Sequence, residues 1–77
     1  MRQSGRPQPA LGTAIRQLRE RHCVTQEDLA RKARLSGRTL SAIETGNANP
    51  TWATVRDIAA ALGVSIGELA KLSEKHE

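Results

Sequence analysis

The sequence is poor in aromatic residues and in cysteine. Its 77 residues include one Trp and one Cys, and neither Phe nor Tyr, so a hydrophobic core must be built from Leu, Ile, Val and Ala. This composition favours helices, because sheets are enriched in β-branched and aromatic residues. A single cysteine cannot form a disulfide within the chain, which agrees with a reducing compartment.

Long hydrophobic runs are also missing. The longest unbroken apolar run, Ile58 to Leu62, is far shorter than the roughly 20 residues that a membrane-spanning helix needs. The first residues are polar and contain proline, whereas a signal peptide has an apolar stretch. We therefore expect a cytoplasmic protein with no membrane partner. A chain of 77 residues forms one small domain, which excludes a multidomain enzyme.

Acidic residues are scarce in the first half of the chain. Residues 1–38 contain nine Lys or Arg and three acidic residues, whereas residues 39–77 contain three basic and five acidic residues. Most of the basic residues are Arg, which suits bidentate contacts to phosphate and guanine. Solvated helix faces would give similar counts, but the uneven distribution favours one surface that faces a polyanion and an opposite, neutral-to-acidic surface.

The pattern of apolar residues divides the chain into five helical segments. Apolar side chains recur at helical spacing in each segment, and a hydroxyl residue that can accept a hydrogen bond from the first turn precedes four of them. These predicted N-caps are Thr25, Ser36, Thr51 and Ser65. Gly46 and Gly63 are expected to end the third and fourth helices in the left-handed conformation. The sequence predicts an all-α chain with helices at about residues 10–21, 26–34, 37–45, 52–62 and 66–72.

The two ends of the chain lack this periodicity. Residues 1–9 contain two Pro, one Gly and two Arg, so we expect a disordered basic N-terminal arm. Residues 73–77 are polar and are expected to form a frayed tail. Residues 10–72 then form the folded domain.

The second and third helices are separated by a turn of three or four residues, which is the geometry of a helix-turn-helix. A helical corner in an ordinary bundle gives the same pattern. The outward side of the third helix distinguishes the two, because its residues Gly37, Arg38, Ser41 and Thr45 are small or polar with a single basic group. Small side chains allow close approach to base edges, so the pattern favours a helix that enters the DNA major groove.

The stretch from Thr25 to Leu69 resembles the XRE-like family of transcriptional regulators, the Cro and phage-repressor type of helix-turn-helix protein. The motifs that carry the resemblance are TQEDLARKA, LSGRTLSAIETG, the Asn-Pro pair and DIAAALGVSIGEL, together with IRQLR in the first helix. The resemblance implies a compact five-helix, lambda-repressor-like domain that binds operator DNA, usually as a homodimer. We expect the domain to need no cofactor.

The resemblance also assigns groove-facing positions in the third helix, at about residues 37–45. Arg38 is the strongest candidate for reading a base, because a guanidinium can bridge O6 and N7 of guanine. Direct readout is expected to be limited, so DNA shape, the arm or half-site spacing must contribute to specificity. The expected base-reading residues are Arg38, Ser41, Gly37, Ala42 and Thr39.

Phosphate contacts and a structural ion pair complete the expected interface. Glu44 near the groove would repel phosphate, and the family pattern pairs it with Arg19, which is also expected to reach a phosphate. Cys23 and Arg34 stand where members often have Gly, and positive φ there would cost about 1 kcal/mol each. The expected phosphate contacts are Gln26, Arg16, Arg19, Arg34, Thr45 and Asn47.

Other functional classes find less support. No catalytic or phosphate-cradling motif is present, and His22 with Cys23 supplies too few ligands for a structural metal site. Leu69 and Leu72 are expected to contribute to dimerisation, and Trp52 is expected in the core or at a dimer edge. One alternative is a protein-interaction module, such as an antitoxin or a bridging coactivator, with secondary DNA binding. Another is the DNA-binding fragment of a longer regulator.

Overall fold

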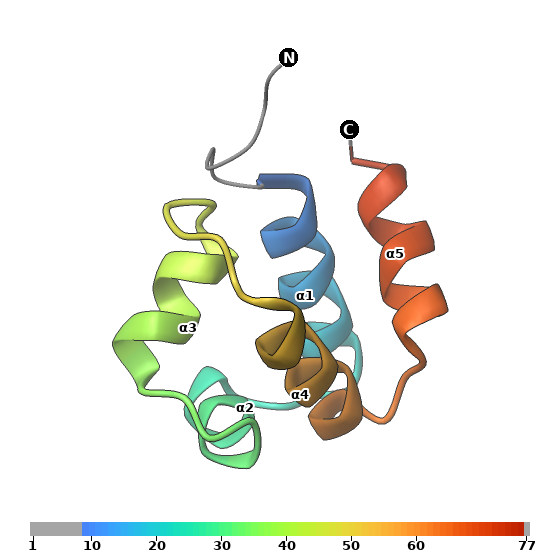
Figure 1. Cartoon of the computed structure of the whole chain (residues 1–77). Helices are drawn as coiled ribbons and strands as arrows, with labels where there is room; N and C mark the ends of the chain where they lie inside the picture. The colour runs from blue at the N-terminus through green and yellow to red at the C-terminus, as the bar shows by residue number, and fades with distance from the viewer. Residues whose placement is uncertain (1–8, 77) are drawn as a thin grey trace.

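The computed structural model describes residues 9–76, which form five helices and no strand (Figure 1). This confirms the all-α prediction. No helix among the described residues has the length and apolar character needed to cross a membrane, and these residues contain no group of His, Cys, Asp and Glu that could hold a metal ion. The helices are α1 (Pro9–Arg21), α2 (Gln26–Lys32), α3 (Gly37–Glu44), α4 (Trp52–Leu62) and α5 (Ile66–Glu74).

Side-chain caps begin four of the helices, as the sequence predicts. In each case a hydroxyl oxygen accepts a hydrogen bond of 3.0 or 3.1 Å from the backbone N–H three residues further on. At Ser65 the cap is reciprocal, because the Glu68 carboxylate also accepts from the Ser65 N–H at 3.2 Å. Each cap contributes about 1 kcal/mol to the stability of its helix. The capping residues are Thr25, Ser36, Thr51 and Ser65.

Some helix ends differ from the predicted ones. α1 starts at Pro9, a residue type well suited to the first helical position. α3 ends at Glu44, with Thr45 as its C-cap. α5 runs to Glu74, two residues beyond the predicted end at Leu72, and the His76 ring lies 3.0 Å from Gln17 Oε1 of α1. The predicted arm at residues 1–9, apart from Pro9, and Glu77 of the predicted tail lie outside the described residues.

Apolar residues from all five helices form one core around α1, which packs against α3 on one side and α5 on the other (Figure 1). The α1 and α3 backbones approach each other closely at Gly12, where a Cβ atom would overlap the Ile43 carbonyl oxygen and lie 2.8 Å from that of Glu44. This approach places the end of α3 against α1. The fully or nearly fully buried large side chains are Ile15, Leu29, Leu40, Ile58 and Leu69.

Four positions in the connections between helices have positive φ. Gly46 and Gly63 do so at 80° and 73°, as predicted for the ends of α3 and α4. Cys23 and Arg34 do so at 58° and 62°, in the positions where family members often have Gly. Because a Cβ atom disfavours this conformation by roughly 1–2 kcal/mol, both turns are strained relative to a glycine.

Candidate nucleic-acid interface

α2 and α3 form the helix-turn-helix, and the turn between them is residues 33–36. Ala33 is buried in the core, and the Leu35 N–H donates to the Ala30 carbonyl at 2.8 Å. These contacts fold the chain back against α2. Ser36 then caps α3, so the direction of α3 is set immediately after the turn.

The two sides of α3 have different environments. Leu40 and Ile43 are buried, whereas Gly37, Arg38 and Thr39 are exposed. The remaining predicted base-reading residues, Ser41 and Ala42, are half-buried. The residues that the sequence assigns to base reading therefore include three on an open surface and two at its margin.

Two of the exposed residues of α3 differ in their hydrogen bonding. The Arg38 side chain forms no hydrogen bond or ion pair with the described residues. Thr39 Oγ1 accepts a hydrogen bond of 2.9 Å from the Ser36 hydroxyl. Arg38 thus keeps all its donors available, while Thr39 is already part of the N-terminal cap of α3.

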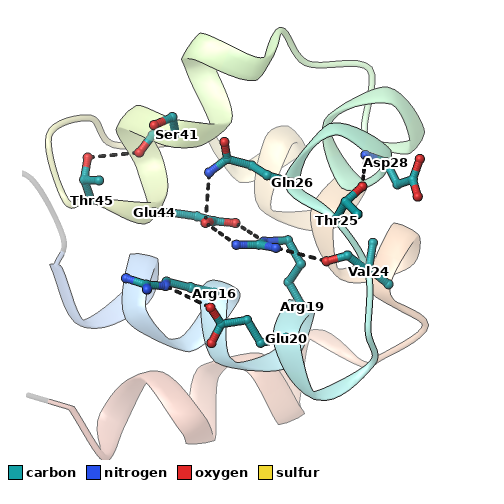
Figure 2. Close-up of polar contacts among 10 residues, drawn as sticks. All are labelled: Arg16, Arg19, Glu20, Val24, Thr25, Gln26, Asp28, Ser41, Glu44 and Thr45. Atoms are coloured by element: carbon teal, nitrogen blue, oxygen red, sulfur yellow. Dashed lines mark hydrogen bonds and ion pairs between the residues drawn. The ribbon is translucent and has the colours of Figure 1, made fainter.

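A buried ion pair joins α1 to the end of α3 (Figure 2). Arg19 Nε donates to Glu44 Oε2 at 2.8 Å and Arg19 Nη2 donates to Glu44 Oε1 at 3.2 Å. The Arg19 and Glu44 side chains are only 13% and 3% exposed. The hydrogen bond to Glu44 raises the pKa of Arg19 above its ordinary value. The structure therefore contains the Arg19–Glu44 pair that the sequence predicts.

The same pair is extended by two contacts that the sequence did not indicate. Arg19 Nη1 donates to the Val24 carbonyl at 3.0 Å, and Gln26 Nε2 donates to Glu44 Oε1 at 3.1 Å (Figure 2). The Arg19–Val24 contact is local, because Val24 lies in the turn that follows α1. The Gln26–Glu44 contact joins residues 18 positions apart and depends on how α2 lies beside α3, which no sequence spacing encodes. Together they tie α1, the start of α2 and the end of α3 into one network.

Most of the predicted phosphate contacts lie together. Arg16, Arg19, Gln26 and Thr45 line one polar hollow with Glu20 and Glu44. Asn47 adjoins it, because its Nδ2 donates to Thr45 Oγ1 at 3.1 Å. Arg34 is separate and lines a different hollow with Lys32 and residues of α4.

Several of these polar residues are already engaged within the chain. Arg16 Nε pairs with Glu20 at 3.2 Å on the surface, and Thr45 Oγ1 donates to the Ser41 carbonyl at 2.9 Å (Figure 2). The exposed Arg16–Glu20 pair is easily exchanged for another anion, because surface pairs contribute little. The buried Arg19–Glu44 pair is not, so Arg19 acts mainly as a structural residue.

The two predicted dimerisation residues occupy different environments. Leu69 is 1% exposed and belongs to the core of the chain itself. Leu72 is half-buried in a groove between α1 and α5. Burial leaves Leu69 little surface to offer a second molecule.

Comparison with known proteins gives the family. Residues 10–72 match the helix-turn-helix domain family. The chain is also 39% identical over 59 residues to an uncharacterized HTH-type transcriptional regulator, y4dJ, of Sinorhizobium fredii, and the match covers 77% of each chain. The chain belongs to the helix-turn-helix family of DNA-binding transcriptional regulators. This confirms the family that the sequence motifs indicate.

Solved structures of other regulators share the fold of this helix-turn-helix protein. The clp gene regulator ClgR of Corynebacterium glutamicum is 29% identical with a TM-score of 0.85, and the match covers 88% of both chains. The restriction-modification controller protein C.AhdI of Aeromonas hydrophila is 28% identical with a TM-score of 0.77, covering 79% of this chain and 92% of that one. Both of these neighbours are regulator or controller proteins.

Proposed function

We propose that this helix-turn-helix protein reads a specific operator sequence in double-stranded DNA and acts as a repressor or controller of transcription. It works in the cytoplasm as a homodimer and catalyses no reaction. The observation that carries the proposal is the open outer side of α3, where Arg38 has no partner among the described residues. The regulators and controllers that resemble the chain do not favour the alternative of a protein-interaction module.

The size of α3 supports its placement in the major groove. Its eight residues span about 12 Å, which matches a major groove about 12 Å wide. The N-terminal end of α3 carries Gly37 and Arg38, and a Cβ at Gly37 would meet no atom within 4 Å beyond the adjoining residues and the backbone of its own helix. A small residue beside Arg38 lets the backbone approach the base edges, so that the guanidinium can donate to O6 and N7 of one guanine.

The remaining predicted residues take supporting roles in this proposal. Ser41 donates or accepts at a base edge, Ala42 contacts a thymine methyl group, and Thr39 contributes at the margin. The network around Glu44 keeps α3 fixed relative to α1, so the helix arrives in the groove without reordering. The proposed phosphate contacts are Arg16, Gln26, Thr45 and Asn47 around the polar hollow, Arg34 at the turn, and Arg19 through its remaining N–H groups.

Selection of binding sites from random DNA duplexes tests this function. The expected product is an inverted repeat whose half-site centres lie about one helical turn apart, because a two-fold dimer presents two copies of α3. Affinity for the selected site is expected to fall roughly a thousandfold between about 50 and about 200 mM salt, as for a protein that contacts six or more phosphates. Recovery of unenriched sequences, or affinity insensitive to salt, would contradict the proposal.

A further inference from the structure

Trp52 is an exposed aromatic residue outside the DNA-facing helices. Its side chain is 63% exposed, and no other large apolar side chain among residues 9–76 is exposed. The expectation that it lies in the core is therefore wrong, which leaves the dimer edge. Burying such a side chain in a partner is favourable, because it removes a large apolar surface from water.

Trp52 forms one wall of an apolar hollow made by α1, α4 and α5. The hollow combines large apolar walls with a small residue, Ala70, that leaves space between them. The projecting ring and the hollow therefore lie side by side on one face. α2 and α3 contribute nothing to this face. The other lining residues are Leu11, Val55, Ile66, Leu69, Ser73 and Glu74.

Charges at the edges of this face are complementary to each other. Glu74 lies at one edge of the hollow, and Arg56 lies one helical turn after Trp52 on α4. Both are exposed, and neither forms an ion pair among the described residues. In a two-fold contact, any pairing of Arg56 of one copy with Glu74 of the other would occur twice.

We propose that this face is the homodimer interface, in which Trp52 of each copy enters the hollow of the other. The two-fold axis passes beside the paired Trp52 rings, and Arg56 of one copy faces Glu74 of the other. A ring and its receiving hollow on one face are what an isologous contact requires, because the same surface must complement itself. The inference rests on the dimeric operator reader proposed above. It places dimerisation at Trp52, with Leu69 only at the floor of the hollow.

The fluorescence of Trp52 provides a direct test, because the chain has no other Trp and no Tyr. As the full chain is diluted, we expect the emission maximum to shift to longer wavelength at the concentration where sedimentation shows dimers dissociating. Iodide quenching should increase over the same range. If the dimers dissociate while the emission maximum and the iodide quenching of Trp52 stay constant, the proposal is wrong.

Charge reversal tests the orientation of the two copies. Arg56→Glu and Glu74→Arg should each weaken dimerisation about tenfold, because each places like charges together, and the double variant should restore it. Lys71→Glu is the control, since Lys71 is exposed on α5 but does not line the hollow. Equal weakening by Lys71→Glu, or no rescue in the double variant, would contradict the interface.

Trp52→Ser separates this inference from the proposed function. The exposed ring supports little of the core, so circular dichroism should show a folded monomer. That monomer should still bind a single half-site with the sequence preference of the native protein. If it dimerises as well as the native chain, the interface is wrong and operator reading stands. If the native chain is monomeric at every concentration, on DNA and off it, both the interface and the dimeric reader are wrong.

Discussion

Two arginines on neighbouring helices show how this molecule separates support from recognition. Arg19 on α1 is 13% exposed and gives three of its N–H groups to Glu44 and Val24. The Arg38 side chain on α3 is exposed and forms no hydrogen bond or ion pair with another described residue. Arginine thus plays two roles in this chain: Arg19 fixes α3 in place, and Arg38 remains available for an outside partner. Burial and pairing, and not residue type, decide which role each plays.

The contrast extends to the surroundings of the two arginines. On α1, about two turns before Arg19, the backbones of α1 and α3 come so close that Gly12 has no space for a Cβ atom. Beside Arg38, a Cβ atom at Gly37 would meet no atom within 4 Å beyond the adjoining residues and the backbone of its own helix. Two glycines therefore serve opposite purposes: one lets two helices pack together, and the other lets a helix approach a ligand.

Removing Arg19 should disrupt the supporting region most strongly. Arg19→Ala leaves the Glu44 carboxylate buried without its cation, which should lower the free energy of unfolding by about 3–5 kcal/mol. Arg16→Ala is the matched control, because the Arg16–Glu20 side chains are 62% and 56% exposed and such a pair contributes under about 1 kcal/mol. Urea denaturation measures both. Equal losses would show that burial does not distinguish the two pairs.

Filling the contact between α1 and α3 should have the next largest effect. Gly12→Ala forces a Cβ atom against the Ile43 carbonyl oxygen, so the helices must separate at a cost of about 1–3 kcal/mol. Gly67→Ala provides the comparison, since the nearest atom to its Cβ would be Ser65 Oγ at 3.7 Å. That change should be neutral or stabilising by up to about 1 kcal/mol. A tolerated Gly12→Ala in thermal unfolding would argue against the close approach.

Relieving the turn before α3 should have a smaller effect of opposite sign. Arg34→Gly removes the Cβ penalty at φ 62° and should stabilise the fold by up to about 1 kcal/mol. Lys32→Gly, at a helical position two residues earlier, should instead destabilise it by about 1 kcal/mol. If Arg34 contacts phosphate, the stabilised variant should also bind all DNA sequences more weakly by a similar factor. A loss of stability on Arg34→Gly would mean that the Arg34 side chain makes a contact worth more than the strain.

The sequence predicted the helices well because their starts are encoded locally. Thr25, Ser36, Thr51 and Ser65 each cap a helix through a residue three positions away, so the signal and the contact lie in the same short stretch. The end of α5 is different. Its C-cap is Lys75 and not a glycine, so no stop signal in the sequence marks it. It packs beside α1, where His76 reaches Gln17, 59 residues away.

Only part of the candidate site could be predicted from the sequence. The Arg19–Glu44 pair follows from a family motif, but the Gln26–Glu44 contact arises only when α2 and α3 meet in space. The Arg19–Val24 contact is local, yet no residue pattern marks it, because its acceptor is a backbone carbonyl. The exposure of Trp52 was equally hidden, because its position on α4 fits the helical apolar pattern. A periodic pattern of apolar residues predicts which side of a helix is apolar, but it does not show whether other parts of the chain cover that side.

The affinity of the Arg38→Ala variant for operator duplexes tests the central claim most directly. In the selected half-site, each base pair is replaced in turn, and binding of the native chain and the variant is measured at one salt concentration. The account predicts that the variant loses about 1–3 kcal/mol of discrimination at one G·C pair and keeps its preferences elsewhere, while its free energy of unfolding stays unchanged. Uniform weakening at all positions, as expected for a phosphate contact, would contradict the role of Arg38 as the base reader on the open side of α3.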